Sequence, residues 1–499
     1  MAGKFITRKN PALYEINTAA WLFELSRKLG RNILLGEIPP QEWDRLKDLG
    51  MDYVWLMGVW SRSQEGRKMN IDSQEARAFY ETVLPACSPE DILGSCYAIG
   101  SYGPDPLVGS WQDLDKARAE INQRGMGLIL DFVPNHTGVD HHFIDEHPEY
   151  YIRGTRDDYL QDKTAFFPVK QAGALWYIAH GRDPNFPPWS DTAQLDYFNP
   201  DVREVMIQRI EEIARHCDGI RCDMAMLVLN AIFHRTWGWA NKNPARAIPR
   251  QEFWEQAISR VPGLVYIAEA YWDTEWTLQQ LGFDFTYDKR LYDRLRGGLP
   301  HEVYLHLTAA PDYQARLLRF IENHDELRSV LAFGKGKTEA VATLYSTLPG
   351  MRLFFDGQLE GKQIRLPLQI RRSRPEPVDP VIQAFYTRLI PEINREIYHA
   401  GHWKLKPVFI DDESSAENII AFLWEMGGLR RLVTVNLNQH PSRGRITLQD
   451  DVDESQTYVF SGILSEGRFQ ECGKILAHPG FILNLTGYQA QIWQIEPTS

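Results

Sequence analysis

Short apolar runs in this chain repeatedly end on polar side chains. The polar residues at their ends are Asn135 and His136, Arg221 and Asp223, Glu269, and His324 and Asp325. Paired carboxylates without metal-ligand spacing suit glycoside hydrolysis, in which one group protonates the leaving oxygen and the other attacks or stabilises the sugar cation. These residue types therefore point to acid–base chemistry on a sugar, provided that the fold brings them together.

The runs themselves are typical of buried parallel strands, because they are almost continuously hydrophobic and are bounded by polar residues. Segments with helical periodicity alternate with them, which indicates a parallel sheet with crossover helices. We count eight strands, near residues 11–17, 53–60, 127–136, 219–223, 264–269, 282–287, 317–325 and 351–355. The sequence therefore predicts an α/β fold, a (β/α)8 TIM barrel, whose strand ends share one pocket.

Two further parts are expected beside the barrel. Residues 137–198 are rich in aromatic residues, Pro, Gly and Asp, and loops of that length are usually functional, so we predict a small lobe inserted after strand 3. Short β-type runs separated by turns predict a C-terminal antiparallel β-sandwich domain. The predicted domains are the first part of the barrel (1–136), the inserted lobe (137–198), the second part of the barrel (199–400) and the β domain (401–499).

Composition excludes several classes of partner. The 499 residues carry a net charge of −12, which disfavours nucleic acid and anionic membranes. The first ten residues lack the apolar core of a signal peptide, and no stretch approaches the roughly 20 apolar residues of a membrane span. The five scattered cysteines show no CxxC spacing, which suits a reduced compartment and argues against a zinc site. We therefore expect a cytoplasmic protein; the oligomeric state stays open.

Taken in order, the motifs resemble the four signature regions of the α-amylase family (glycoside hydrolase family 13) of retaining glycosidases and transglycosylases. These motifs are Asp131-Phe-Val-Pro-Asn135-His136, Gly219-Ile-Arg221-Cys-Asp223, Glu269 and Asn323-His324-Asp325. The segment Gln194–Pro200 resembles the further family motif that closes the inserted lobe. The resemblance covers nearly the whole chain.

The resemblance implies catalytic roles for three carboxylates. Asp223 would be the nucleophile that forms a covalent glycosyl-enzyme, and Glu269 would be the general acid and then the base. Asp325 would bind sugar hydroxyls and stabilise the transition state. Arg221 would keep Asp223 ionised while Glu269 stays protonated.

The resemblance also implies binding roles. His136 and His324 would hydrogen-bond the hydroxyls of the reacting sugar, and Tyr97 resembles the aromatic platform beneath that ring. Asn135 and Asp196 match positions that bind Ca²⁺ in many members, and oxygen ligands suit calcium. An asparagine that ties two loops together is the alternative interpretation of Asn135. No cofactor is required for the expected reaction.

Two positions depart from the family pattern. Starch-cutting members commonly carry a Lys-His pair after the nucleophile, whereas Met224–Leu227 follow Asp223 here. The aspartate that usually lies three residues before the platform tyrosine is Gly94. The first departure weakens an assignment as an endo-acting amylase, and the second weakens an assignment as an exo-acting pocket enzyme.

Several other features have bland interpretations. The aromatic pairs around Trp176–Tyr177 and Phe186–Trp189 suit either further sugar contacts or a small core of the lobe, and both remain open. His141–His142 fits a solvated loop better than a metal site. Arg371–Arg374 fits a basic turn better than a phosphate site.

The sequence therefore predicts a retaining hydrolase of α-linked glucosides, with α-1,4-glucan oligosaccharides as its main substrates. An α-glucan transglycosylase is the alternative, because it uses the same covalent intermediate and a sugar acceptor instead of water. A glycan-binding or scaffold subunit without catalysis is a third hypothesis, disfavoured because Asp223, Glu269 and Asp325 are all retained. Linkage, chain length and acceptor stay open.

Overall fold

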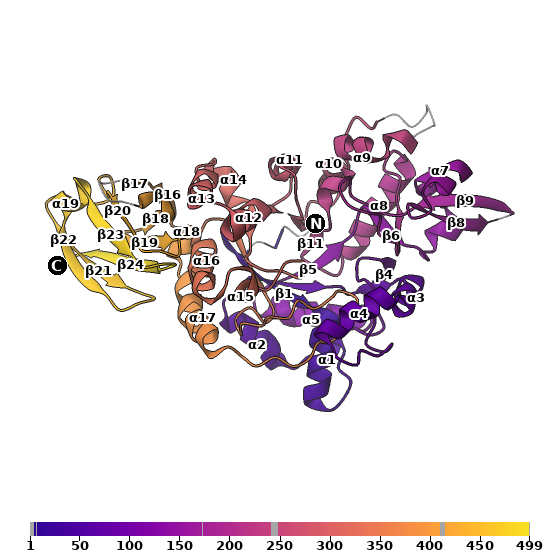
Figure 1. The fold of residues 1–499 in the computed structure, drawn as a ribbon, viewed down its shortest axis with the longest axis horizontal. Coiled ribbons are helices and arrows are strands. Elements are labelled where there is room, and N and C mark those ends of the chain that lie inside the picture. Colours follow the sequence, from indigo (N-terminus) through magenta and orange to yellow (C-terminus); the bar gives the residue numbers. More distant parts are fainter. Residues whose placement is uncertain (1–3, 6, 172, 241–247, 410–414, 499) are drawn as a thin grey trace.

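The computed structural model describes residues 4–5, 7–171, 173–240, 248–409 and 415–498. Residues 1–3 and 6, which belong to the N-terminal stretch without the apolar core of a signal peptide, lie outside these ranges. A β-barrel surrounded by helices forms the middle of the molecule. The inserted lobe lies at one end of the long axis of the molecule and the C-terminal β domain at the other (Figure 1).

Within the described residues, eight parallel strands form a closed barrel, as the sequence predicts. The strands are β1 (Ala12–Asn17), β2 (Tyr53–Met57), β5 (Gly127–Phe132), β11 (Gly219–Cys222), β12 (Val265–Ala268), β13 (Phe285–Tyr287), β14 (Leu317–Arg319) and β15 (Met351–Phe355). Each pairs with the next along the chain, and β15 closes the barrel on β1. All their carboxyl ends therefore point to the same side of the barrel.

Three predicted strands end at least three residues earlier than expected, at Met57, Phe132 and Arg319, and local features explain the first two. The second stops at Met57, because Gly58 has a left-handed φ of 75° and a Cβ there would lie 2.9 Å from Cβ of Cys96. The third stops at Phe132, since Pro134 cannot donate a ladder hydrogen bond. The chain then continues as a separate strand outside the barrel.

Helices surround the barrel, and their starts are encoded locally. In α5 (Trp111–Gln123), Ser110 and Asp113 exchange side-chain and backbone hydrogen bonds in a capping box. The described helices around the barrel are α1 (Thr18–Leu29), α2 (Pro40–Asp48), α3 (Gln64–Asp72), α4 (Gln74–Val83), α8 (Pro200–Ile213), α9 (Asn230–Trp237), α10 (Phe253–Arg260), α11 (Glu275–Gln280), α12 (Lys289–Gly297), α13 (Pro300–Leu307), α14 (Pro311–Ala315), α15 (Ser329–Ala332), α16 (Lys335–Thr347), α17 (Pro380–Ile393) and α18 (Ile397–Ala400). None of the described helices is both long enough and apolar enough to cross a membrane.

The inserted lobe is anchored to the barrel by a short ladder. Strand β6 (His136–Gly138) pairs antiparallel with β10 (Thr192–Gln194), so the segments that enter and leave the lobe lie side by side. Beyond this ladder the lobe contains the sheet β7 (Arg153–Gly154), β9 (Ala174–Ala179) and β8 (Phe166–Gln171), with α6 (Phe143–Glu146) and α7 (Arg156–Gln161).

The C-terminal domain consists of antiparallel sheets. In the part that the structure describes, one sheet has the order β16-β18-β19-β24-β21-β22 and the other the order β17-β20-β23. Their strands are β16 (His402–Lys406), β17 (Val408–Phe409), β18 (Ile419–Met426), β19 (Leu429–Asn436), β20 (Ser442–Ile446), β21 (Thr457–Gly462), β22 (Arg468–Cys472), β23 (Phe481–Leu485) and β24 (Ala490–Pro497). The domain is fixed to the barrel by Trp424, whose indole N–H donates to the carbonyl of Thr347 at 2.7 Å.

Candidate active site

A cavity of about 980 Å³ opens at the carboxyl ends of the barrel strands. Of the seven residues predicted for the site, the five on its wall are Tyr97, His136, Asp223, Glu269 and Asp325. The other two, Arg221 and His324, are buried behind the wall, where each contacts carboxylates that line the cavity. The structure thus brings all seven predicted residues together.

A single guanidinium serves three carboxylates at the base of the site. Arg221 is fully buried, with Nη1 2.7 Å from Oδ1 of Asp223 and Nη2 2.7 Å from Oε2 of Glu269. Nη1 also lies 3.6 Å from Oδ1 of Asp131. The ring of Trp55 packs against the guanidinium, with 5.1 Å between the guanidinium carbon and the ring centroid. One buried cation is therefore shared among three acids.

This sharing changes the expected role of Arg221. Burial raises the pKa of Asp223 to about 8, with Arg221 opposing the rise and Glu269 adding to it. Arg221 acts on Asp223 in the direction that the sequence suggested, but it contacts Glu269 equally closely. The protonated form of Asp223 is therefore favoured by burial, while the guanidinium favours its charged form.

The third carboxylate lies in a different electrostatic setting. His324 contacts Glu15 through Nδ1 at 2.5 Å and Asp325 through Nε2 at 3.0 Å. Burial alone would lower the pKa of His324, but Asp325 and Glu15 raise it well above 6.5, so the imidazole is charged. Burial alone would raise the pKa of Asp325, but His324 lowers it to about 2. Asp325 is therefore ionised at neutral pH.

Tyr97 and His136 complete the predicted set. The hydroxyl of Tyr97 lies 3.0 Å from Nε2 of His324, and the two rings stack with centroids 5.5 Å apart. Burial lowers the pKa of His136 to about 4, so its imidazole is neutral and offers both a donor and an acceptor. The His136 ring lies 5.2 Å from the ring of Trp189 in the lobe.

Asn135 is engaged within the protein. Its amide pairs with that of Gln194, at 3.2 Å from Nδ2 to Oε1 and 3.0 Å from the Gln194 nitrogen back to Oδ1. Oδ1 of Asp196 accepts the backbone N–H of Phe198 at 3.0 Å. The Asn135 contacts fit the loop-tying interpretation better than a calcium ligand, because its side-chain oxygen already accepts a hydrogen bond. Calcium binding stays a prediction.

The two aromatic clusters of the lobe lie in different surroundings. Phe186 and Trp189 line the cavity together with the prolines between them. Trp176 instead stacks under the guanidinium of Arg153 at 4.5 Å, and the ring of Tyr177 packs on that of Tyr159 at 4.9 Å. The first cluster can contact a ligand, whereas the second belongs to the packing of the lobe itself.

The departures from the family pattern leave an apolar patch on the wall. Met224 lines the cavity, whereas Met226 and Leu227 are buried in the 3-10 turn that follows. Trp272, three residues after Glu269, also lines the cavity and is 37% exposed. The wall beyond the carboxylates therefore offers flat apolar contact where a Lys-His pair would offer charge.

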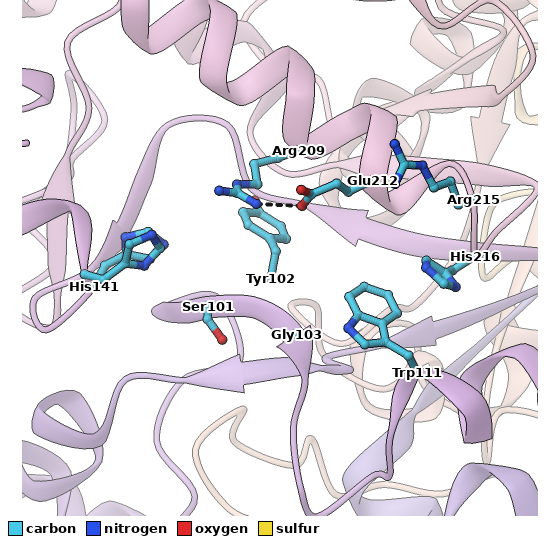
Figure 2. Close-up of a pocket in the computed structure, with 10 residues that line it drawn as sticks. Ser101, Tyr102, Gly103, Trp111, His141, Arg209, Glu212, Arg215 and His216 are labelled. Atoms are coloured by element: carbon cyan, nitrogen blue, oxygen red, sulfur yellow. Dashed lines mark hydrogen bonds and ion pairs between the residues drawn. The ribbon is translucent and has the colours of Figure 1, made fainter. Parts of the chain in front are cut away.

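A second, smaller cavity of about 390 Å³ shares no lining residue with the first. Figure 2 shows the ion pair between Arg209 and Glu212 above Tyr102, with His216 beside Trp111. Arg209 and Glu212 are 2.6 Å apart, and His216 lies 2.6 Å from Asp115. His141 and His142 also line this cavity, and in the described part of the chain no group of three or more His, Cys, Asp or Glu residues could hold a metal ion.

Two residues of the main site were not found from the sequence. Glu15 is completely buried in β1, and a lone acid inside an apolar strand is the signal that could have revealed it. Tyr271 lines the cavity and contacts Glu269, but a tyrosine two residues after a glutamate carries no signal of its own. The basic turn after β15 is paired, since Arg372 contacts Asp91 at 2.6 Å.

Known proteins of related sequence include sugar-processing enzymes and an amino acid transporter heavy chain of Homo sapiens, which is 24% identical over 196 residues. Residues 40–281 match the alpha amylase catalytic domain. Alpha-amylase 3 of Dictyoglomus thermophilum is 24% identical over 310 residues, 59% of this chain and 59% of that protein. The alpha-glucosidase of Apis mellifera is 22% identical over 399 residues, 68% of this chain and 64% of that protein. The matches thus span less than two thirds of either relative.

The fold extends over the whole chain. The crystal structure of the maltogenic alpha-amylase AmyB from Thermotoga neapolitana superposes with a TM-score of 0.70 at 20% identity, covering 98% of this chain and 99% of that chain. A parallel barrel with carboxylates at its strand ends, an inserted lobe and a C-terminal β domain defines a class of barrel glycosidases. Within that class, residues 40–281 are similar to the catalytic domain of the α-amylase family.

Proposed function

We propose that this protein is a retaining glycoside hydrolase that acts on α-linked glucosides, with α-1,4-glucan oligosaccharides as its main substrates. The observation that supports this most strongly is the carboxylate pair Asp223 and Glu269 on one buried guanidinium at the cavity wall. The cavity, at about 980 Å³, has room for a short oligosaccharide.

In this proposal the carboxylates divide the reaction between them. Asp223 attacks the anomeric carbon while Glu269 protonates the departing oxygen, and Glu269 then removes a proton from the water that releases the sugar. Ionised Asp325 stabilises positive charge on the sugar ring. Neutral His136 hydrogen-bonds a sugar hydroxyl, and Tyr97 lies beneath the ring.

Transglycosylation is the second candidate, and the apolar patch favours it. Met224, Trp272 and Trp189 present flat or flexible apolar surface in the cavity, on which the face of an acceptor sugar can stack. Stacking of this kind would let a sugar compete with water for the covalent intermediate. A glycan-binding role without catalysis is disfavoured, because Asp223, Glu269 and Asp325 all line the cavity.

The first test is a time course with purified protein and maltotetraose. Hydrolysis gives only shorter sugars, whereas transglycosylation gives longer and shorter sugars together. The Asp223→Asn variant, assayed in parallel, should form neither. No product from maltotetraose or from aryl α-glucosides would contradict the proposed substrate class.

We also propose a cytoplasmic location. The five cysteines lie in the described ranges and are free thiols, two of them only partly buried. Free thiols suit a reducing compartment.

A further inference from the structure

The carboxylate of Glu269 is contacted unequally on its two oxygens. Oε2 accepts the backbone N–H of Met224 at 2.7 Å and lies 2.7 Å from Nη2 of Arg221. Oε1 accepts the hydroxyl of Tyr271 at 2.6 Å. A carboxylate oxygen has two lone-pair positions. Oε2 therefore accepts one described hydrogen bond and faces the buried guanidinium as an ion pair, while Oε1 accepts the hydrogen bond from Tyr271.

The turn after Glu269 fixes Tyr271 in this place. The hydroxyl of Thr274 donates to the carbonyl of Tyr271 at 2.6 Å. Between them, Trp272 and Asp273 have φ angles of 56° and 66°, a left-handed conformation that residues with side chains rarely adopt. Asp273 is paired with Arg290. An unusual backbone conformation held on both sides is a common feature of functional sites.

We propose that Tyr271 is the positioning residue of the acid/base, and that Glu269 carries its catalytic proton on Oε1. This inference rests on the proposed function. Because Oε2 accepts the backbone N–H of Met224 and lies against the positive charge of Arg221, an added proton binds Oε1. The phenol hydroxyl of Tyr271 fixes the direction of that oxygen.

The proton and electron pairs then balance in the first step. The proton leaves Oε1 for the glycosidic oxygen, which also takes the electron pair of the breaking bond to the anomeric carbon. A carboxylate oxygen of Asp223 supplies the pair for the new bond. The hydroxyl of Tyr271 continues to donate to Oε1 as that oxygen becomes charged, and a donor aimed at developing charge accelerates the step.

The test compares two substrates that differ in their need for an acid. Tyr271→Phe removes the hydroxyl and keeps the ring. We expect kcat/KM to fall about 10- to 100-fold for maltose, whose leaving group needs a proton, and to stay nearly unchanged for a 2,4-dinitrophenyl α-glucoside, whose leaving group does not. Tyr313→Phe removes a hydroxyl from a neighbouring cavity that neither Glu269 nor Tyr271 lines, and it should change neither.

Glu269→Gln separates this inference from the proposed function. If Glu269→Gln spares the dinitrophenyl substrate and loses maltose, Glu269 is the acid. Tyr271→Phe must then show the same selectivity in weaker form; an equal loss on both substrates, or no loss, would overturn the inference. If Glu269→Gln slows both substrates equally, the proposed function itself is wrong.

A second variant keeps the inference testable if Tyr271→Phe does not fold. Thr274→Val removes the hydroxyl that holds the carbonyl of Tyr271 and leaves the phenol in the chain. We expect a smaller loss in the same direction, on maltose and not on the dinitrophenyl substrate. Should Tyr271→Phe fail to fold, a loss on both substrates or on neither in Thr274→Val would count against the inference.

Discussion

Two buried clusters of charge in the barrel have opposite compositions. In the active site, Arg221 alone faces Asp131, Asp223 and Glu269. In the other cluster, the carboxylate of Asp288 is contacted by Arg319 at 3.1 Å and by His306 at 2.9 Å.

The ratio of cations to carboxylates sets the ionisation of each cluster. Burial raises the pKa of Asp223 to about 8, because one guanidinium shared by three acids cannot compensate. Burial would also raise the pKa of Asp288, but His306 and Arg319 lower it to about 2. The second cluster therefore favours the charged form of Asp288, whereas the first favours the protonated form of Asp223.

The largest contrast should come from removing the charge of Asp223. Asp223→Asn should lower kcat by roughly ten-thousand-fold or more, because covalent catalysis loses its nucleophile. The thermal unfolding midpoint should stay equal or rise, since a buried charge without a full partner is removed. Asp293→Asn, at the rim of the same cavity, should leave turnover nearly unchanged. Wild-type turnover in Asp223→Asn would refute the assignment.

The matching substitution in the other cluster should act on stability instead. Asp288→Asn leaves Arg319 and His306 without their carboxylate, and breaking such a buried pair costs about 3–5 kcal/mol of unfolding free energy. Urea unfolding at neutral pH would measure the loss. The carboxylate of Asp288 has its pKa lowered, so its contribution is present above the ordinary aspartate range and is lost as pH falls toward 2. A variant as stable as the wild type would remove the contrast.

The pH dependence should differ in sign at the active site. Burial raises the pKa of the nucleophile Asp223 to about 8, so kcat/KM should rise as pH rises through that value and the carboxylate ionises. Because the pKa of Asp223 is raised, its effect on stability is favourable below the ordinary aspartate range and is lost as pH rises toward 8. Stopped assays from pH 5 to 10 would show this change in kcat/KM. A kcat/KM that stays constant from pH 5 to 10 would contradict the prediction.

A third cluster of intermediate composition sharpens the comparison. His324 lies between Glu15 and Asp325, one cation between two acids. Glu15→Gln removes one acid, so the pKa of His324 should move down and the charge that holds Asp325 should be lost as pH rises past neutrality. We expect kcat/KM to fall about tenfold at pH 8 and less at pH 6, in line with one charged hydrogen bond. Glu37→Gln, in an exposed pair with Arg31, is the matched control.

The barrel could be predicted from the sequence because its strands are continuous apolar runs, whose character does not depend on distant residues. The ends of β2 and β5 could not be predicted from the sequence. They depend on the close approach of Gly58 to Cys96 and on the chain leaving the barrel at Pro134. Asp223 and Glu269 were identified because each ends a strand within a motif. Glu15 was missed because its partner, His324, lies 309 positions away in the chain.

The pairing of β6 with β10 has an evolutionary consequence. Both ends of the inserted lobe leave the barrel at one place and are joined there by a ladder. The barrel is connected to the lobe as it would be to a short hairpin, because the two ends of the insertion are paired. A longer insertion between ends that are already joined adds little to the entropy cost of loop closure. Recombination of the segment between β6 and β10 could therefore replace the part of the cavity wall that the lobe supplies, including Phe186 and Trp189. The carboxylates on the barrel would stay in place.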